Sequence, residues 1–373
     1  MFKTFEMELA GRKLVIETGK MAKQASGAVL VRYGDTVVLV TSTISKEARE
    51  GTDFFPLTVD YEEKMYAVGK MPGGFLRREG RPGNSAILNA RLIDRPIRPL
   101  FDKRCRHDVH VVATVLSVEQ DNAPELCGML GASASLAISN IPWDGPIAGV
   151  RVGCVDGRYV INPTQEQLAA SSMNITVAGS ETAILMVEGG AKEVPEEQVL
   201  DAIMFGHEAI KKLVAFQKQI VAEAGKPKME LVFPEIPADI EQAIHDYAAG
   251  PLKDAIFNPD KLTREAHMAE VRKEVEKHFK EIYPDNAADV DACLDHLTKS
   301  IVRHMISVDK IRPDGRALDE IRPITCEVGL LPRVHGSALF TRGQTQALTI
   351  TTLAPMSETQ IIDDLTTIKE KRY

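Results

Sequence analysis

Apolar residues alternate with polar ones over two pairs of short segments, one pair near each end of the chain. "AVLVRY" (28–33) and "TVVLVTSTI" (36–44) flank Gly34-Asp35, and similar runs flank Arg342-Gly343. β-Branched runs on either side of a two-residue turn predict antiparallel hairpins. Further apolar runs predict strands at 109–118, 147–155 and 182–188.

Helical patterns lie between these strands. "LCGMLGASASLAIS" (126–139) has the small-residue composition of a helix packed closely against a sheet, and residues 196–224 predict another helix. Asn84 is a candidate N-cap for a helix that runs to Arg95, where we expect Pro96 to end it. Strands mixed with helices predict an α/β (α+β) fold for the first part of the chain.

From about residue 238 to 308 the pattern becomes purely helical. Apolar residues recur at helical spacing in "IEQAIHDYA", "MAEVRKEVEKHF" and "VDACLDHLTKSIVRHMI", and no strand pattern remains. Its fourteen acidic residues outnumber nine basic ones. This charge balance makes the segment a poor candidate for binding nucleic acid.

An internal repeat organises the chain. Residues 11–43 match residues 321–352 with nine identical positions. Matched residues are 310 positions apart as far as Arg32 and 309 positions apart after it, where the alignment has a one-residue gap. Average residue usage predicts about two identities. We therefore expect a first core domain at 1–220, an all-helical domain at 238–308 and the start of a second copy of the core at 311–373.

Composition adds limits to this reading. The chain has 373 residues, 44% of them hydrophobic, and a net charge of −8, which is typical of a globular protein with two or three domains. It contains no run of eighteen apolar residues, and its first residues lack the apolar core of a signal peptide, so we expect a cytoplasmic protein without a membrane partner. The five scattered cysteines form no CxxC pair, which argues against a disulfide framework or a zinc site.

One segment opposes the acidic balance of the whole. Eight arginines and Lys103 lie between residues 77 and 106 against three acidic residues, so that this stretch is net +6. Gly73, Gly74, Gly80, Pro82 and Gly83 bracket "FLRRE" and predict an exposed loop. Arginines on a loop bind phosphate, and an adjacent aromatic ring can stack on a base. The loop therefore predicts a single-stranded nucleic-acid site formed by Phe75, Arg77, Arg78 and Arg81.

Three further arginines on the following helix allow two interpretations. Arg91 and Arg95 are four residues apart and share a helix face, while Asp94 can pair with Arg91 or with Arg98. These arginines either bind RNA or form an internal network of ion pairs.

Several motifs together resemble bacterial polyribonucleotide nucleotidyltransferases, also called polynucleotide phosphorylases. They are "ETGKMAKQASGAVLVRYGDTVVL", "GGFLRREGRP", "ARLIDRPIRPLF", "IRPDGR" and "LPRVHGSALFTRGQTQAL", spread from residue 17 to 348. The resemblance implies two ribonuclease PH-like domains joined by a helical domain, a homotrimeric ring around an RNA channel, and partners in RNA-degradation assemblies. It also implies mRNA degradation by phosphate-dependent 3′-to-5′ cleavage to nucleoside diphosphates, with Mg²⁺ as the metal and inorganic phosphate as co-substrate, and the reverse polymerisation.

The same resemblance places no catalytic residue in this chain. The family's catalytic serines, aspartates and lysine belong to the second core, at positions beyond Tyr373. The first copy has Pro124-Glu125 where the serine pair would fall, and Asn174 and Thr176 where an aspartate and the lysine would fall. An amide cannot supply an anionic ligand for magnesium, and Glu125 would repel phosphate. We therefore expect a degenerate first site, with RNA guidance and ring architecture as the role of this part.

Two other classes of function stay open at this point. The chain could be a non-catalytic, ring-forming RNA-binding subunit, which a reading frame that stops at Tyr373 would favour. A metabolic enzyme that binds a phosphorylated small molecule is disfavoured, because the chain has neither a GxGxxG nor a Walker-type phosphate loop.

Overall fold

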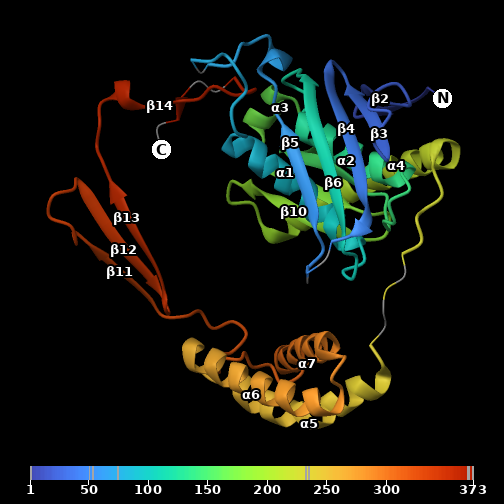
Figure 1. Cartoon of the computed structure of the whole chain (residues 1–373). Coiled ribbons are helices and arrows are strands. Elements are labelled where there is room, and N and C mark those ends of the chain that lie inside the picture. The colour runs from blue at the N-terminus through green and yellow to red at the C-terminus, as the bar shows by residue number, and fades with distance from the viewer. Residues whose placement is uncertain are drawn as a thin grey trace. The chain divides into compact units, whose positions relative to one another are not determined.

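The computed structural model describes residues 2–49, 51–52, 54–73, 75–231, 233, 236–367 and 370–371, so that Gly74 and Tyr373, both named above, lie outside the described residues. The chain forms two compact units, Met1–Phe233 with Thr359–Tyr373 and Pro234–Glu358. Figure 1 shows the elements of both units along the chain.

The first unit contains two main sheets. Six strands form one sheet in the order β1-β2-β3-β4-β6-β5, in which only β5 and β6 run parallel, and four antiparallel strands form the other in the order β10-β9-β7-β8. The strands are β1 (Lys3–Leu9), β2 (Arg12–Thr18), β3 (Gly27–Tyr33), β4 (Thr36–Ala48), β5 (Leu57–Glu62), β6 (His107–Ser117), β7 (Ala148–Val155), β8 (Arg158–Ile161), β9 (Met173–Gly179) and β10 (Ile184–Ala191). The hairpins and strands predicted for this part of the sequence are confirmed.

Helix α2 (Pro124–Ile138) is the centre of this unit. It packs against β3, β4 and β7 and against helix α4, and every residue from Leu126 to Ile138 is buried. A Cβ atom at Gly131 would lie 2.4 Å from a methyl group of Val40. The small residues of this helix are therefore required because the sheet approaches its backbone closely. The predicted close packing is confirmed.

The other helices of the first unit are α1 (Asn84–Ile97), α3 (Gln165–Ala170) and α4 (Glu196–Ala224), with 3₁₀ turns η1 (Met65–Val68) and η2 (Arg98–Leu100). Helix α4 has the predicted bounds. Two predictions for α1 are wrong: Gly83 is the N-cap, without a side-chain bond, and Pro96 lies inside the helix. Pro96 is tolerated because the helix ends one residue later, so that little of the hydrogen-bond ladder depends on it.

The internal repeat is visible in strand pairing. Pairing of β2 with β3 sets Thr18 opposite Val29, and pairing of β11 with β12 sets Val328 opposite Ala338. Thr18 and Val328 are 310 positions apart, whereas Val29 and Ala338 are 309 apart. The one-residue gap therefore lies in the loop between the first two strands of the repeat, and the predicted position after Arg32 is wrong. A shorter loop changes no side-chain direction within a strand, whereas a gap inside the strand would reverse all of them.

The second unit combines a helical bundle and a small sheet. Helices α5 (Ala238–Ile256), α6 (Lys261–Ile282) and α7 (Ala287–Ser307) enclose their own apolar core, which contains Ile244 and Leu294. The sheet has the order β11-β12-β13, with strands β11 (Ile324–Val328), β12 (Gly336–Arg342) and β13 (Thr345–Thr351). A 3₁₀ turn, η3 (Met356–Glu358), follows, and β14 (Gln360–Ile361) and β15 (Glu370–Lys371) pair in the first unit.

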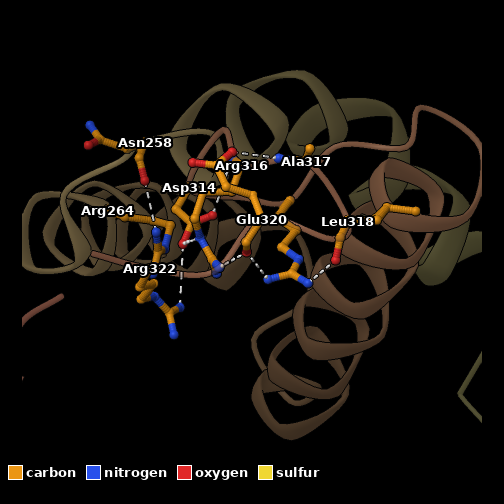
Figure 2. A network of polar contacts seen from close by, with 9 residues as sticks. Asn258, Arg264, Asp314, Arg316, Ala317, Leu318, Glu320 and Arg322 are labelled. Atoms are coloured by element: carbon orange, nitrogen blue, oxygen red, sulfur yellow. Dashed lines mark hydrogen bonds and ion pairs between the residues drawn. The ribbon is translucent and has the colours of Figure 1, made fainter. Parts of the chain in front are cut away.

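The motif "IRPDGR" (311–316) forms a network of polar contacts after α7, shown in Figure 2. The Asp314 carboxylate accepts from Arg316 Nε at 2.9 Å and from Arg322 at 3.4 Å. Arg316 also donates to the Glu320 carbonyl at 2.7 Å, and Arg312 donates to the carbonyls of Glu320 and Leu318. These contacts fold residues 312–322 into a compact clasp, defined here by Arg312, Asp314, Arg316, Glu320 and Arg322.

All five cysteines are free, and four of them are buried: Cys105, Cys127, Cys154 and Cys293. Burial raises the pKa of the Cys127 thiol to about 12. The thiols of the first core therefore act as small apolar groups, whereas Cys326 on β11 is exposed.

Candidate nucleic-acid interface

The predicted arginine loop joins η1 to α1 and is exposed. Phe75 is fully exposed, so its ring contributes nothing to the core. Arg77, Arg78 and Arg81 are also exposed, and Arg77 has a positive φ of 50° and donates to the Pro72 carbonyl at 3.4 Å. The loop thus presents an aromatic face and three guanidinium groups to solvent.

Two adjoining pockets lie beside this loop. The larger, of about 680 Å³, is lined by Arg78 and Arg81. The smaller, of about 340 Å³, lies between α1 and the edge strand β5 and is lined by Arg91. Both share the side chains of Tyr61, Pro82 and Ala86. Arg78 and Arg81 on one side and Arg91 on the other therefore line two pockets that share part of their walls, and we call this pair of pockets the furrow.

The three helix arginines have different roles. Arg95 pairs with Glu188 on β10 at 2.5 Å. Arg98 makes two bonds to Asp94, at 2.6 and 2.9 Å, and a third to the Leu57 carbonyl. Among the described residues, Arg91 has no ion-pair or hydrogen-bond partner. Arg95 and Arg98 are thus held by internal ion pairs, whereas Arg91 stays available to a ligand.

Acidic groups limit what the larger pocket can accept. Glu79 accepts the Met65 amide at 2.9 Å and so ties the loop to η1. Burial raises the pKa of Glu63, and the hydrogen bond from Ser85 lowers it. The negative charges of Asp364 and Glu125 raise it again, so that the net pKa lies above its ordinary value. A polyanion that follows this furrow therefore meets Arg78 and Arg81 at the rim and a partly buried acid inside.

The residues expected to form a degenerate site lie on β9 and at the start of α2. Asn174 and Thr176 lie on β9, where Thr176 is opposite Arg151 of β7. Arg151 forms an ion pair of 2.6 Å with Glu125 at the N-terminus of α2, next to Pro124. Both side chains of this pair are less than one-fifth exposed. The sequence analysis identified Glu125 but missed its partner Arg151. The two residues are 26 positions apart, and no local pattern in the sequence links them.

These residues do not fit a magnesium ion. The Glu125 carboxylate is already neutralised by Arg151, and Asn174 offers only an amide. Within the described parts of the chain, no group of three His, Cys, Asp or Glu residues could hold a metal ion. No step of a reaction can therefore be assigned to a metal bound by these residues.

Comparison with known families accounts for most of the chain. The family "3' exoribonuclease family, domain 1" matches residues 10–142 and 320–369, and "3' exoribonuclease family, domain 2" matches residues 145–209. The family "Polyribonucleotide nucleotidyltransferase, RNA binding domain" matches residues 239–317. The order of these matches confirms the predicted fold class, a ribonuclease PH-like core, then a helical part, then renewed ribonuclease PH-like sequence.

Curated relatives carry one common name. A polyribonucleotide nucleotidyltransferase of Heliobacterium modesticaldum is 59% identical over 99% of this chain and 52% of its own length. Those of Syntrophomonas wolfei and Geobacillus kaustophilus are 55% and 54% identical over the whole of this chain. The chain belongs to the polyribonucleotide nucleotidyltransferase family. It spans about half the length of the curated relatives it matches.

Membership of the polyribonucleotide nucleotidyltransferase family explains the repeat, because both copies fall within the match to the first exoribonuclease domain. In the portion described by the structure, no helix has the length and apolar character needed to cross a membrane.

Proposed function

We propose that this chain supplies the RNA-guiding part of a phosphate-dependent 3′-to-5′ exoribonuclease. In the proposed reaction, inorganic phosphate attacks the terminal linkage of single-stranded RNA and releases a nucleoside diphosphate, and the reverse reaction extends RNA. The family membership and the names of the relatives support this activity for the longer protein.

The observation that carries RNA guidance is the furrow bordered by free arginines. Arg78, Arg81 and Arg91 line its two adjoining pockets, and no ion pair joins them to another described residue. Guanidinium groups bind phosphates by charge-assisted hydrogen bonds, and the exposed ring of Phe75 offers a face on which a base can stack. RNA guidance by Phe75, Arg77, Arg78 and Arg81, with Arg91 added, follows from these positions.

The first repeat does not catalyse in this proposal. The Glu125–Arg151 ion pair fills the position where phosphate would bind, and Asn174 and Thr176 lack the groups needed for metal binding and acid catalysis. We place magnesium and the catalytic groups in the part of the longer relatives that this chain does not span. A homotrimeric ring, mRNA as substrate, partners in RNA-degradation assemblies and a cytoplasmic location belong to the same proposal.

The helical unit is a second candidate RNA contact. The description of the family that matches residues 239–317 supports this role, against our expectation from the excess of acidic residues. Arg272 is occupied by Asp291 and Asp295, so it is not the group that would bind phosphate. Arg303 on α7 and the lysines of the helices are further cations for such a contact.

The test uses a complete enzyme that carries this sequence. Replacement of Arg77, Arg78 and Arg81 by alanine should weaken binding of long single-stranded RNA, while short oligomers turn over at nearly the normal rate. Loss of about three phosphate contacts should make the log-log salt slope shallower by about 2, equally for poly(A) and poly(U).

A matched triple variant, Lys46→Ala/Arg158→Ala/Lys212→Ala, removes the same charge from exposed positions elsewhere in the first unit. It should change the salt slope far less. An unchanged slope in the loop variant would reject the arginine loop as the RNA site.

A further inference from the structure

The segment from Gln360 to Leu365 packs in the first unit, although in sequence it follows the second copy of the repeat. Leu365 is only 5% exposed and belongs to the apolar core of the first unit. Gln120 donates to the Leu365 carbonyl at 3.0 Å, and Lys70 donates to the Asp364 carbonyl at 2.9 Å. One buried side chain and two backbone carbonyls therefore anchor this segment, which we call the acidic strap.

The strap brings two carboxylates into the pocket of the arginine loop. Asp363 and Asp364 line the same pocket as Arg78 and Arg81. Asp363 also lies against the loop backbone, because a Cβ atom at Gly73 would be 2.5 Å from its Oδ2. Both strap carboxylates thus lie within the region that RNA phosphates would have to reach.

The remaining charges in the pocket do not neutralise the strap. Lys64 is paired with Glu62 at 2.6 Å, and Glu63 and Glu79 are acids that accept bonds from Ser85 and the Met65 amide. Asp364 contributes to the raised pKa of Glu63, so the two acids lie close enough to repel each other. Arg78 and Arg81 are therefore the only lining cations, within the described residues, that no carboxylate already occupies.

We propose that the acidic strap is an internal competitor of RNA phosphate for the arginine loop. This inference rests on the proposed RNA-guiding role of the loop and adds a regulatory contact to it. Both strap carboxylates line the pocket of Arg78 and Arg81, and within the described residues no ion pair joins them to either arginine, so the competition acts through charge across the pocket. RNA bound at the loop weakens docking of the strap, and by reciprocity a docked strap weakens RNA binding.

The experiment uses the complete enzyme with Asp363→Asn/Asp364→Asn. Affinity for poly(A) at low salt should rise about fivefold, the size expected when two partly solvated charges beside the binding arginines are removed, and the gain should fall as salt rises. The control Asp156→Asn/Asp201→Asn makes the same charge change on exposed residues of the first unit and should give a smaller gain. In the background Arg78→Ala/Arg81→Ala the gain should disappear, because the groups for which strap and RNA compete are absent.

Three outcomes would each overturn the competition: an unchanged affinity in the strap variant, an equal gain in the control pair, or an equal gain in the arginine-free background. Hydrogen exchange of residues 360–365 without RNA tests docking separately from RNA binding. Arg78→Ala/Arg81→Ala should increase exchange there, and unchanged exchange would show that the arginines do not hold the strap. If exchange increases in Arg78→Ala/Arg81→Ala but the triple loop variant binds RNA normally, RNA guidance by the loop is rejected. The contact between the arginines and the strap is then still supported.

Discussion

At the scale of single residues, the ionic partner decides what each charged group can do. The eight arginines of the basic stretch are equivalent in sequence, yet Arg95 is paired with Glu188 whereas Arg91 borders an open furrow. Glu125 shows the same effect, because its pairing with Arg151 turns a residue expected to repel phosphate into half of a neutral pair. The sequence located these groups, but only the fold distinguished the occupied ones from the free ones.

Glu63 offers a test of pocket electrostatics at this scale. A carboxyl with a raised pKa contributes stability that is complete below its ordinary pKa and is lost as pH rises through the raised value. Glu63→Gln removes this pH-dependent loss of stability, and the glutamine side-chain oxygen can still accept the hydrogen bond from the Ser85 hydroxyl. The variant should equal the parent below about pH 4 and exceed it at pH 7 by about 0.5 kcal/mol, a figure reduced for partial solvent screening.

Chemical denaturation at both pH values measures this difference. The substitution Glu230→Gln, at an exposed position, separates the effect of the pocket from that of removing one negative charge. A gain for Glu63→Gln that is the same at pH 4 and pH 7 would contradict the assignment.

At the scale of elements, the periodic patterns were reliable and the ends and loops were less so. The paired apolar runs became β3 and β4, and residues 196–224 became α4 with the predicted bounds. The ends of α1 were wrong because capping depends on local backbone geometry that Asn84 and Pro96 alone do not fix. The gap in the repeat was misplaced for a similar reason, since chance identities at Ala338 and Arg342 outweighed strand register.

The clasp between α7 and β11 is the element whose loss is simplest to test. Burial by itself would raise the pKa of Asp314, but the bonds from Arg316 and the charge of Arg322 lower it below its ordinary value. Asp314→Asn should therefore lower the free energy of unfolding by about 1–2 kcal/mol at pH 7, the cost of losing charged hydrogen bonds. The stability that the carboxylate contributes is present above its ordinary pKa and is lost as pH falls through the lowered value, so parent and variant should converge in acid.

Thermal unfolding of the complete protein at pH 7 and in acid provides the measurement. Asp319→Asn, at an exposed position in the same segment, is the matched control. A variant as stable as the parent at pH 7 would mean that the clasp contributes nothing to the fold.

At the scale of the whole molecule, the first copy of the repeat contains the helix that covers its sheet, whereas the equivalent residues of the second copy lie outside the span of this chain. In the first copy the sheet is covered by α2, and Val31, Val38 and Val40 are fully buried. In the second copy every residue of β11 and β13 is exposed, including Val328 and Ile350. The same strand pattern therefore forms a sheet in both places, but a core only where a helix packs on it.

The chain by itself should not perform the proposed reaction. We expect no release of nucleoside diphosphate when the purified 373-residue chain is mixed with oligoadenylate, phosphate and magnesium, because its first site is filled by an ion pair. Product can be measured by chromatography, with a complete family member as the positive control. Phosphate-dependent product from the purified chain would refute the degenerate first site.

The sequence by itself determined the class of fold, the repeat, the helical segment and the position of the arginine loop. These features depend on local periodicity, turn residues and charge density, which are present in contiguous residues. Tertiary structure decided that Arg91 stays free, that Arg151 neutralises Glu125, and that Asp363 and Asp364 lie beside the loop. These facts depend on residues that are far apart in the chain. The ion pair between Arg95 and Glu188, which are 93 positions apart, is a further example. No local pattern encodes such a contact, because the distance between two charges is set by the packing of the elements that carry them.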